Sequence, residues 1–274
     1  THPGPAPSRS ADLVVWGEAP ASVPLSEARS RAFAERVLQD SGGKPTLFGI
    51  VLARETGQET LFNSALLVQS PGAPLQRYDK QRLLPFAEYL PLAEYLPILR
   101  SFSPASGRFS PGLGAPSLRL GTRELAVFLC YEALSPSLVN HLVRAQRAQL
   151  LINLTNDGWF GDSAEPWMHL ALSKFRAIEH RRFLVRATTT GASAVIDPAG
   201  RVLVQTPLFQ AANVSQRVAW LRPTTLFELC GTWLWWLIAA VPLFCAFAQR
   251  EQGRPVGIGA RVRKAPTGAR SRVE

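Results

Sequence analysis

One uncharged stretch near the C-terminus limits the folds open to this chain more than any other segment. Residues 229–248, LCGTWLWWLIAAVPLFCAFA, form a run of 20 residues without a charge, and a helix of about 20 apolar residues crosses a bilayer. Tryptophans lie near one end of the run and arginines follow the other, as at the two faces of a membrane. We therefore predict a transmembrane helix over 229–248; the alternative is a buried core helix.

The positive charge of the chain is concentrated behind this stretch. The formal net charge is +10, and residues 249–274 carry seven arginines and lysines against two glutamates, which makes +5. Positively charged flanks remain on the cytoplasmic side, so we expect a basic cytoplasmic tail at 249–274 with residues 1–228 on the opposite face. Net charge alone would allow a nucleic-acid partner, but a basic tail behind an apolar span favours a membrane, and no nucleic-acid partner is predicted.

Residues 12–225 have the pattern of an α/β domain, because apolar β-branched runs alternate with helical patterns. Strands are predicted at 13–16, 46–55, 60–69, 125–130 and 150–155, and helices at 26–40 and 135–149. A further helix after Pro166 places Trp167, Leu170 and Phe175 on one face. The preceding residues 1–11 are rich in Pro and Ser and are expected to be a disordered lead-in.

Cys130 is the candidate nucleophile. Cys230 and Cys245 lie in the predicted span, so Cys130 has no ready disulfide partner, which is unusual for an exported domain. It ends the apolar run LAVFLC and precedes a helix that begins near Ser135, so the field of the helix N-terminus would stabilise its thiolate. The alternative is an inert buried cysteine.

A thiol nucleophile needs a proton acceptor. Two histidines that follow it on one helix, His169 and His180, leave a Cys–His dyad open. The other route uses a carboxylate and a lysine: Glu18 ends the first strand, and Lys80 lies in RYDKQRLLPF. No metal centre is predicted, because the chain has no HxxxH, HExxH or CxxC spacing.

Several segments resemble the nitrilase, or carbon–nitrogen hydrolase, superfamily. Glu18 after VVW, Lys80 in YDKQRLLPFAEYLP and Cys130 in FLCYE match its Glu–Lys–Cys triad in chain order. NDGWFGDS, RAIE and SAVIDPAG within 156–200, together with the terminal apolar helix, narrow the resemblance to the apolipoprotein N-acyltransferase family. The resemblance implies an α/β fold: a nitrilase-like α-β-β-α sandwich over 12–225, followed by one C-terminal transmembrane helix.

The resemblance also implies an activity. An acyl chain would move from a membrane glycerophospholipid, through a thioester on Cys130, to the N-terminal amine of diacylglyceryl-cysteine in an apolipoprotein. Glu18 would accept the proton and Lys80 would stabilise the oxyanion. No cofactor is implied. We expect a monomer in the bacterial inner membrane, with the catalytic domain on the periplasmic face and the C-terminus in the cytoplasm.

The pentapeptide AEYLP occurs twice, at 87–91 and at 93–97. The family has a supporting glutamate eight residues after its lysine, so the resemblance selects Glu88 and not Glu94. Glu132 in CYE is a second matched acid, expected to anchor Lys80 or its loop. The residues expected to form the substrate pocket or a lid are Tyr131, Asn156, Trp159 and Phe160. Three further residues match the family's helix, and the alternative for them is a solvated, ion-paired helix face: Arg176, Glu179 and Arg182.

Two features depart from the family. Gly17 stands where proline is usual, which predicts a looser turn before Glu18. The family's multi-helix membrane domain and the first strand of its nitrilase-like domain are missing ahead of LVVW, so we expect a fragment of the full enzyme. Two alternatives remain: an amidase that hydrolyses a small amide, and an inactive membrane-tethered binding module.

Overall fold

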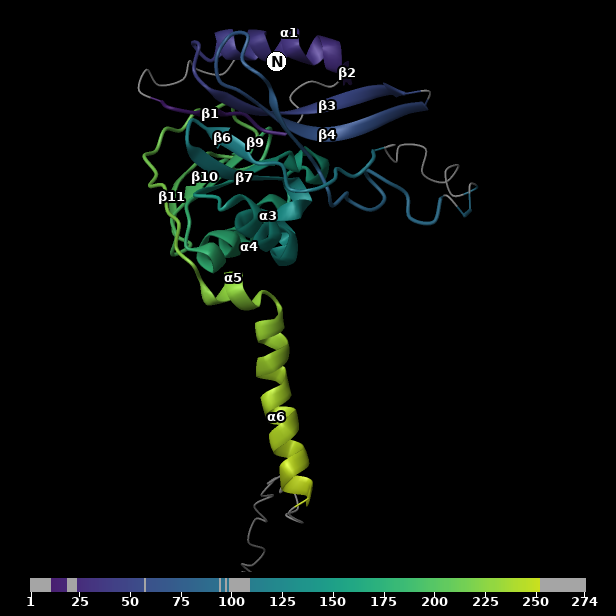
Figure 1. Ribbon diagram of the computed structural model, residues 1–274, viewed down its shortest axis with the longest axis vertical. Helices are drawn as coiled ribbons and strands as arrows, with labels where there is room; N and C mark the ends of the chain where they lie inside the picture. The colour runs from purple at the N-terminus through teal and green to yellow at the C-terminus, as the bar shows by residue number, and fades with distance from the viewer. Residues whose placement is uncertain are drawn as a thin grey trace, which may run out of the picture. The chain divides into compact units, whose positions relative to one another are not determined.

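Two facing β-sheets form the centre of the computed structural model, which describes residues 11–18, 24–56, 58–93, 95–96, 98 and 109–251. The chain divides into two units, Thr1–Thr232 and Trp233–Glu274. Helix α1 (Glu27–Asp40) covers one sheet, and helices α3 (Pro136–Gln146) and α4 (Glu165–His180) cover the other. The first unit is therefore layered α-β-β-α (Figure 1).

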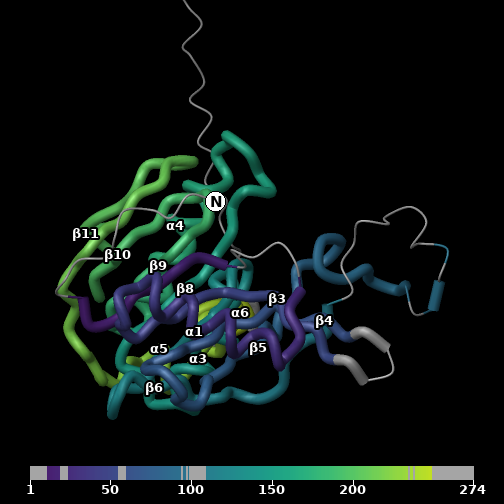
Figure 2. Tube along the Cα trace, turned by 90° about the horizontal axis from the view of Figure 1, so that it is seen from above, coloured from purple at the N-terminus to yellow at the C-terminus, as the bar shows by residue number. Residues whose placement is uncertain are grey.

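The first sheet has the strand order β1-β3-β4-β5, with β2 paired to β3. Its strands are β1 (Val14–Val15), β2 (Leu25–Ser26), β3 (Thr46–Thr56), β4 (Gln58–Val68) and β5 (Gln76–Asp79). Strands β3 and β4 pair antiparallel along their whole length, whereas β1 runs parallel to β3. The chain after β5 extends beyond the sheets on the side where β3 ends and β4 begins (Figures 1 and 2).

The second sheet has the order β11-β10-β9-β8-β7-β6, and its central strands β7, β8 and β9 are parallel. Its strands are β6 (Leu118–Leu120), β7 (Arg123–Leu129), β8 (Leu150–Thr155), β9 (Leu184–Thr188), β10 (Ala194–Ile196) and β11 (Val202–Gln205). Short 3-10 helices follow two of them, η1 (Cys130–Leu134) after β7 and η2 (Asp157–Phe160) after β8. The carboxyl ends of parallel strands thus lead directly into two turns that can carry functional groups.

The alternation of side chains between the two faces of the first sheet explains the layering. Leu47 and Leu67 belong to the core between the sheets, whereas their neighbours Phe48 and Leu66 pack with the buried side of α1. Successive side chains of a strand point to opposite faces, so both faces of β3 and β4 are apolar and both are covered.

Most predicted elements are confirmed. The predicted strands coincide with β1, β3, β4, β7 and β8, and Ser26 caps α1 by accepting a hydrogen bond from the backbone of Arg29. Helix α3 ends earlier than predicted, because Arg147 takes a left-handed conformation at its C-terminus. The predicted nitrilase-like α-β-β-α arrangement is also confirmed.

The predictions for α4 were partly wrong. Trp167 and Phe175 are 42% and 52% exposed, whereas the buried side of the helix carries polar residues such as Ser173 and Arg176. Arg182 is buried and pairs with Glu228 of helix α5 (Leu226–Cys230), which contradicts the alternative of a solvated face for this residue. Periodicity located the helix but not its buried face, because hydrogen-bond partners from other elements cover the polar residues.

The segment predicted to cross a membrane is divided. Helix α5 ends at Cys230, Gly231 takes a positive φ of 56°, and helix α6 (Trp233–Glu251) begins beyond it. No helix within the described ranges combines the length and apolar character that a membrane crossing requires. The predicted transmembrane helix over 229–248 is therefore not confirmed.

Candidate active site

Three ends of strands meet at the predicted catalytic residues. Glu18 follows β1, Lys80 follows β5, and Cys130 follows β7. Their exposed fractions are 6%, 2% and 8%. The electrostatic field at Cys130 includes contributions from both Glu18 and Lys80. The structure thus brings together three residues that lie more than 40 positions apart in the sequence.

The turn that presents Glu18 is held by residues at the ends of β8 and β9 in the second sheet. The backbone N–H of Glu18 donates to the Thr155 carbonyl at 3.3 Å, and the Thr189 hydroxyl donates to the Glu18 carbonyl at 2.8 Å. A Cβ on Gly17 would lie 2.6 Å from the Thr189 backbone nitrogen, so the close approach requires glycine. The prediction of a looser turn was wrong, because glycine here permits tight packing rather than motion.

Lys80 is enclosed by two carboxylates. Its Nζ lies 2.9 Å from Glu88 Oε1 and 3.5 Å from Glu18 Oε1. Burial alone lowers the pKa of Lys80, but the charges of Glu18, Cys130 and Glu88 outweigh it and raise the pKa above its ordinary value. Lys80 is therefore a permanent ammonium group inside the site, able to act as a hydrogen-bond donor and a positive charge.

Asn63 joins the two carboxylates and was missed by the sequence analysis. It lies in β4, and its Nδ2 donates to Glu18 Oε1 at 2.6 Å and to Glu88 Oε1 at 2.7 Å. Its backbone carbonyl accepts from the N–H of Lys80. The only signal in the sequence was an asparagine within the predicted strand TLFNSALLVQ.

Glu88 and Glu132 are both buried, as expected of supporting residues, but they contact different groups. Glu88 holds Lys80 directly and also accepts from the Leu84 backbone at 2.7 Å. Glu132 accepts from three backbone N–H groups, those of Gln81, Arg82 and Leu129, and from the Tyr78 hydroxyl. Of the two roles expected for Glu132, its hydrogen bonds fit the anchoring of the loop and not of the Lys80 ammonium.

Cys130 begins η1 with a φ of 45°, in the left-handed region, which costs an ordinary L-residue about 1–2 kcal/mol. Burial, and then the charge of Glu18, raise the pKa of its thiol to about 12, while the charge of Lys80 opposes the shift. At neutral pH the thiol is therefore protonated and requires a base when it attacks. Such a backbone is typical of strained turns at functional sites.

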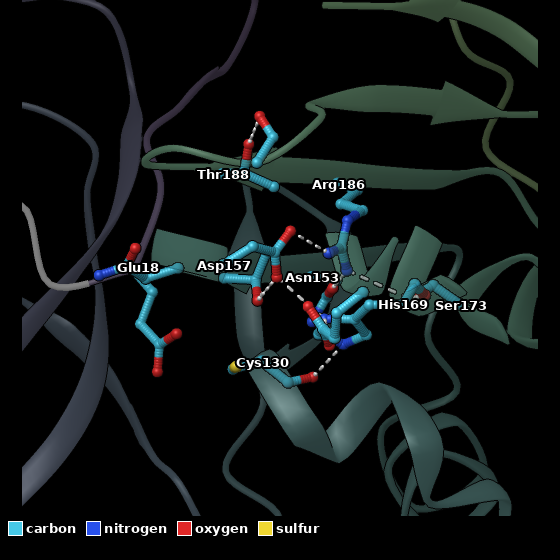
Figure 3. Close-up of polar contacts among 12 residues, drawn as sticks. Glu18, Cys130, Asn153, Asp157, His169, Ser173, Arg186 and Thr188 are labelled. Carbon is cyan, nitrogen blue, oxygen red and sulfur yellow. Dashed lines mark hydrogen bonds and ion pairs between the residues drawn. The ribbon is translucent and has the colours of Figure 1, made fainter. Parts of the chain in front are cut away.

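His169 does not act as that base in this geometry. Its Nε2 lies 3.3 Å from the carbonyl oxygen of Cys130, and Figure 3 shows the sulfur pointing the other way, toward the side of Glu18. His180, the other histidine of α4, lies 3.5 Å from Glu228 and forms an edge contact with Phe227, both in α5. The Cys–His alternative is therefore not supported.

Asp157, Glu165 and His169 bring three potential metal-ligand atoms within 4.8 Å of one another. Both oxygens of Asp157 are already engaged, one by His169 at 3.0 Å and the other by the guanidinium of Arg186 at 2.8 Å. The positive charge of Arg186 opposes binding of a divalent cation, so we assign no metal to this cluster.

The residues expected to form a pocket or lid lie in or next to two short 3-10 turns, η1 and η2. Tyr131 follows Cys130 in η1 and is 38% exposed; Trp159 and Phe160 in η2 are 79% and 40% exposed. Asn156 instead forms the turn, because its side chain accepts from Gly158 and Thr190. Large apolar side chains are also exposed in the segment after Lys80, namely Phe86, Leu92, Tyr95, Leu96 and Ile98. Glu94 lies outside the described residues.

Comparison with known proteins gives a consistent result. Residues 5–217 match the carbon-nitrogen hydrolase family. Two proteins named apolipoprotein N-acyltransferase are similar: one from Geobacter metallireducens, 33% identical over 243 residues, and one from Haemophilus influenzae, 34% identical over 230 residues. These alignments cover 88% and 80% of this chain but 46% and 43% of the relatives, so the chain spans about half their length.

A solved structure agrees in fold. An amidase from Nesterenkonia sp. aligns with a TM-score of 0.55 and 23% sequence identity, covering 74% of this chain and 75% of that chain. At this identity the agreement concerns the arrangement of helices and strands, and not the substrate.

Proposed function

Because the chain belongs to the carbon–nitrogen hydrolase family, we propose that it forms the catalytic part of an apolipoprotein N-acyltransferase. The observation that carries the proposal is the buried cluster in which Lys80 lies between Glu18 and Glu88, next to a cysteine held in a strained turn. The names of the relatives supply the class of reaction. The donor is a glycerophospholipid, and the acceptor is the N-terminal amine of a lipid-modified cysteine in an apolipoprotein.

In the first half-reaction, the Cys130 sulfur attacks the ester carbonyl of the phospholipid. Glu18 accepts the thiol proton during the attack, because a thiol with a pKa of about 12 does not ionise by itself at neutral pH. The bond from carbon to sulfur forms, the ester bond from carbon to oxygen breaks, and Glu18 returns the proton to the departing lysophospholipid oxygen. The product is a thioester on Cys130.

Glu18 has an oxygen free for this proton. Asn63 and Lys80 both approach Oε1, and among the described residues no hydrogen-bond donor reaches Oε2. The ammonium group of Lys80 and the backbone N–H of Tyr131 are the donors that stabilise the negative charge on the substrate oxygen. Glu88 keeps Lys80 at this position by holding a second hydrogen of its ammonium group.

In the second half-reaction, the acceptor amine attacks the thioester carbonyl. Glu18 takes a proton from the amine, an amide bond forms, and the bond from carbon to sulfur breaks. The sulfur leaves with the proton held by Glu18, which restores the thiol. The same base thus serves both steps, and no cofactor enters the balance.

Exposed apolar side chains support a lipid substrate. Phe86, Leu92 and Tyr95 in the segment after Lys80 are 68%, 62% and 81% exposed. Trp159 and Phe160 are exposed apolar side chains of another turn. Exposed apolar groups of this size mark binding surfaces or contact with lipid. The chain would therefore act at a membrane surface, with these side chains in contact with acyl chains of the donor.

An alkyne-tagged phospholipid tests the proposal. The full chain in phospholipid micelles is expected to acquire a label that hydroxylamine removes, as a thioester requires, and Cys130→Ala is expected to abolish it. Cys245→Ala is the matched control, because this thiol lies in the second unit. A label retained in Cys130→Ala contradicts the mechanism, and rapid hydrolysis of small amides without any phospholipid would favour the amidase alternative.

A further inference from the structure

A buried polar network lies next to the backbone of the nucleophile, and the reaction outlined above makes no use of it. Its members come from four elements: Asn153 in β8, Asp157 in η2, His169 and Ser173 in α4, and Arg186 in β9. Each has an exposed fraction of 4% or less. Burying this many polar groups is costly unless they hydrogen bond, so their arrangement calls for an explanation.

Arg186 links three other members of the network by hydrogen bonds. Its guanidinium donates to Asn153 at 2.7 Å, to Ser173 at 3.2 Å and to Asp157 at 2.8 Å. Ser173 in turn donates to the backbone carbonyl of His169 at 2.7 Å. The side chains therefore fix one another, and α4 is tied to β8 and β9.

Two contacts connect the network to the end of β7. Asn153 Nδ2 donates to the carbonyl of Phe128 at 3.2 Å, and His169 Nε2 lies 3.3 Å from the carbonyl of Cys130 (Figure 3). These carbonyls lie on either side of Leu129, whose own N–H is held by Glu132. The backbone at the nucleophile is thus contacted at three consecutive residues, Phe128, Leu129 and Cys130.

The atoms that face the two ring nitrogens of His169 determine whether each nitrogen donates or accepts a hydrogen bond. Nδ1 lies 3.0 Å from the Asp157 carboxylate and 4.0 Å from Glu165, and Nε2 faces the Cys130 carbonyl. Ionised carboxylates and carbonyl oxygens only accept hydrogen bonds. Both ring nitrogens must therefore carry hydrogen for both contacts to be hydrogen bonds, and Asp157, itself held by Arg186, orients the ring.

We propose that His169 is a positioning residue, which holds Cys130 in its left-handed backbone conformation by donating from Nε2 to the Cys130 carbonyl. The strained φ of 45° needs such support. Releasing the carbonyl lets the turn relax toward an ordinary backbone and carries the thiol out of the buried position beside Glu18 and Lys80. The inference deepens the proposed function, since it concerns the same nucleophile, but it does not depend on which acyl group is transferred.

Two substitutions separate the contacts of His169. In His169→Gln the side-chain amide nitrogen lies near the position of Nε2 and still donates to Cys130. In His169→Asn it lies near the position of Nδ1, so the contact with Asp157 remains and the contact with Cys130 is lost. Both variants place a neutral amide in the same buried site, so a general loss of packing affects them equally.

Alkylation of Cys130 by iodoacetamide gives a readout that needs no lipid. The extent is measured by mass spectrometry on the tryptic peptide 124–144, which contains Cys130 as its only cysteine. We expect His169→Asn to react about tenfold faster than wild type at pH 9, because a fall of about one unit in the raised thiol pKa increases the thiolate fraction tenfold. His169→Gln is expected to remain within about threefold of wild type.

Acyl transfer gives the second readout. We expect kcat to fall about 10²-fold in His169→Asn with KM little changed, since a nucleophile displaced by about 1 Å loses reactivity and not substrate affinity. His169→Gln is expected to recover most of this loss. Equal alkylation rates in the two variants, or equal loss of kcat, would overturn the assignment.

A further measurement covers the outcome in which His169→Asn does not fold. Nitrogen-15 spectra of histidine-labelled wild-type chain, assigned with His169→Gln, report whether Nε2 carries hydrogen at pH 7. A protonated Nε2 is expected, and an unprotonated one would refute the proposal. If the wild-type chain transferred no acyl group to an amine, the proposed function would fail while the alkylation comparison still decided the role of His169.

Discussion

Two buried glutamates of the same site, Glu88 and Glu132, differ in what surrounds them. Glu88 lies among side chains that carry charge or can move: the ammonium of Lys80 and the amide of Asn63, with a single backbone N–H from Leu84. Glu132 accepts three backbone N–H groups and the hydroxyl of Tyr78. One carboxylate is bound mainly by side chains and the other mainly by the main chain.

This difference implies that Glu88 positions the charged group of Lys80, whereas Glu132 holds the backbone of the loops around the site. A hydrogen bond to Lys80 sets the position of the proposed catalytic donor, whereas bonds to the backbone of Gln81, Arg82 and Leu129 fix the loops that carry Lys80 and Cys130. Removal of a buried acceptor leaves its donors unsatisfied, which costs about 1–3 kcal/mol for each uncompensated group. The two residues should therefore respond differently to the same substitution.

Glu18→Gln removes the proposed general base and should lower activity more than a substitution of Glu88 or Glu132. We expect acyl transfer to fall by about 10²–10⁴-fold, the range for loss of a general base. Alkylation of Cys130 at pH 8 should instead become faster, because the charge of Glu18 helps to raise the thiol pKa to about 12. Stopped-flow acylation and iodoacetamide kinetics measure the two effects. A slower reaction in both assays would mean that Glu18 is only structural.

Glu88→Gln should lower kcat by about 10²-fold, because Lys80 loses the charged partner that positions it. The midpoint of denaturant unfolding should change little compared with the change in kcat. Glu94→Gln, in the second copy of AEYLP, is the matched control and should leave acyl transfer near that of wild type. Equal effects of the two substitutions would remove the distinction between the copies.

Glu132→Gln should act mainly on stability. The glutamine amide can accept at only one of its two ends, so its nitrogen must face a backbone N–H or the Tyr78 hydroxyl. We expect a loss of about 2–3 kcal/mol in the free energy of unfolding, measured by chemical denaturation. Unchanged stability with a large loss of kcat would place Glu132 in the same class as Glu88.

The smallest effect is expected for a substitution of Glu179, a carboxylate of α4 outside the site, and it concerns the pH dependence of stability. Burial raises its pKa to about 7, despite the ion pair with Arg176 at 2.6 Å, whereas an unfolded glutamate titrates near 4.3. The folded chain therefore retains this proton between about pH 4.3 and 7 while the unfolded chain releases it, so stability falls as pH rises through this window.

In Glu179→Gln this contribution disappears, and the dependence of unfolding free energy on pH between 4.5 and 7 should become flatter. Acyl transfer at pH 7 should remain unchanged. Denaturation curves at several pH values compare the variant with wild type, and an unaltered slope would show that Glu179 is ionised in the folded chain throughout this range.

Prediction from sequence succeeded where one local pattern was enough. The apolar runs that become β7 and β8, and the helix that becomes α1, were identified from neighbouring residues alone. The family resemblance selected Glu88, eight residues after Lys80, and the structure places the two in contact. Asn63 was missed, since one polar residue in an apolar strand has no special meaning until the carboxylates it bridges are known.

The sequence by itself determined several of the strands and helices and the residue types available for chemistry: a carboxylate and a cysteine at the ends of predicted strands, and a lysine between them in the chain. Only the tertiary structure decided how they act. Pairing of β1 with β3 and of β5 with β4 places Glu18 and Lys80 at strand ends of one sheet, and the sheet that faces it carries Cys130 at the end of β7. Burial makes the thiol of Cys130 weakly acidic. The contact of His169 in α4 with the Cys130 carbonyl, and that of Arg186 in β9 with Asp157, lie beside the strained turn at Cys130. Buried polar groups need hydrogen-bond partners, and here the tertiary structure supplies them from separate elements.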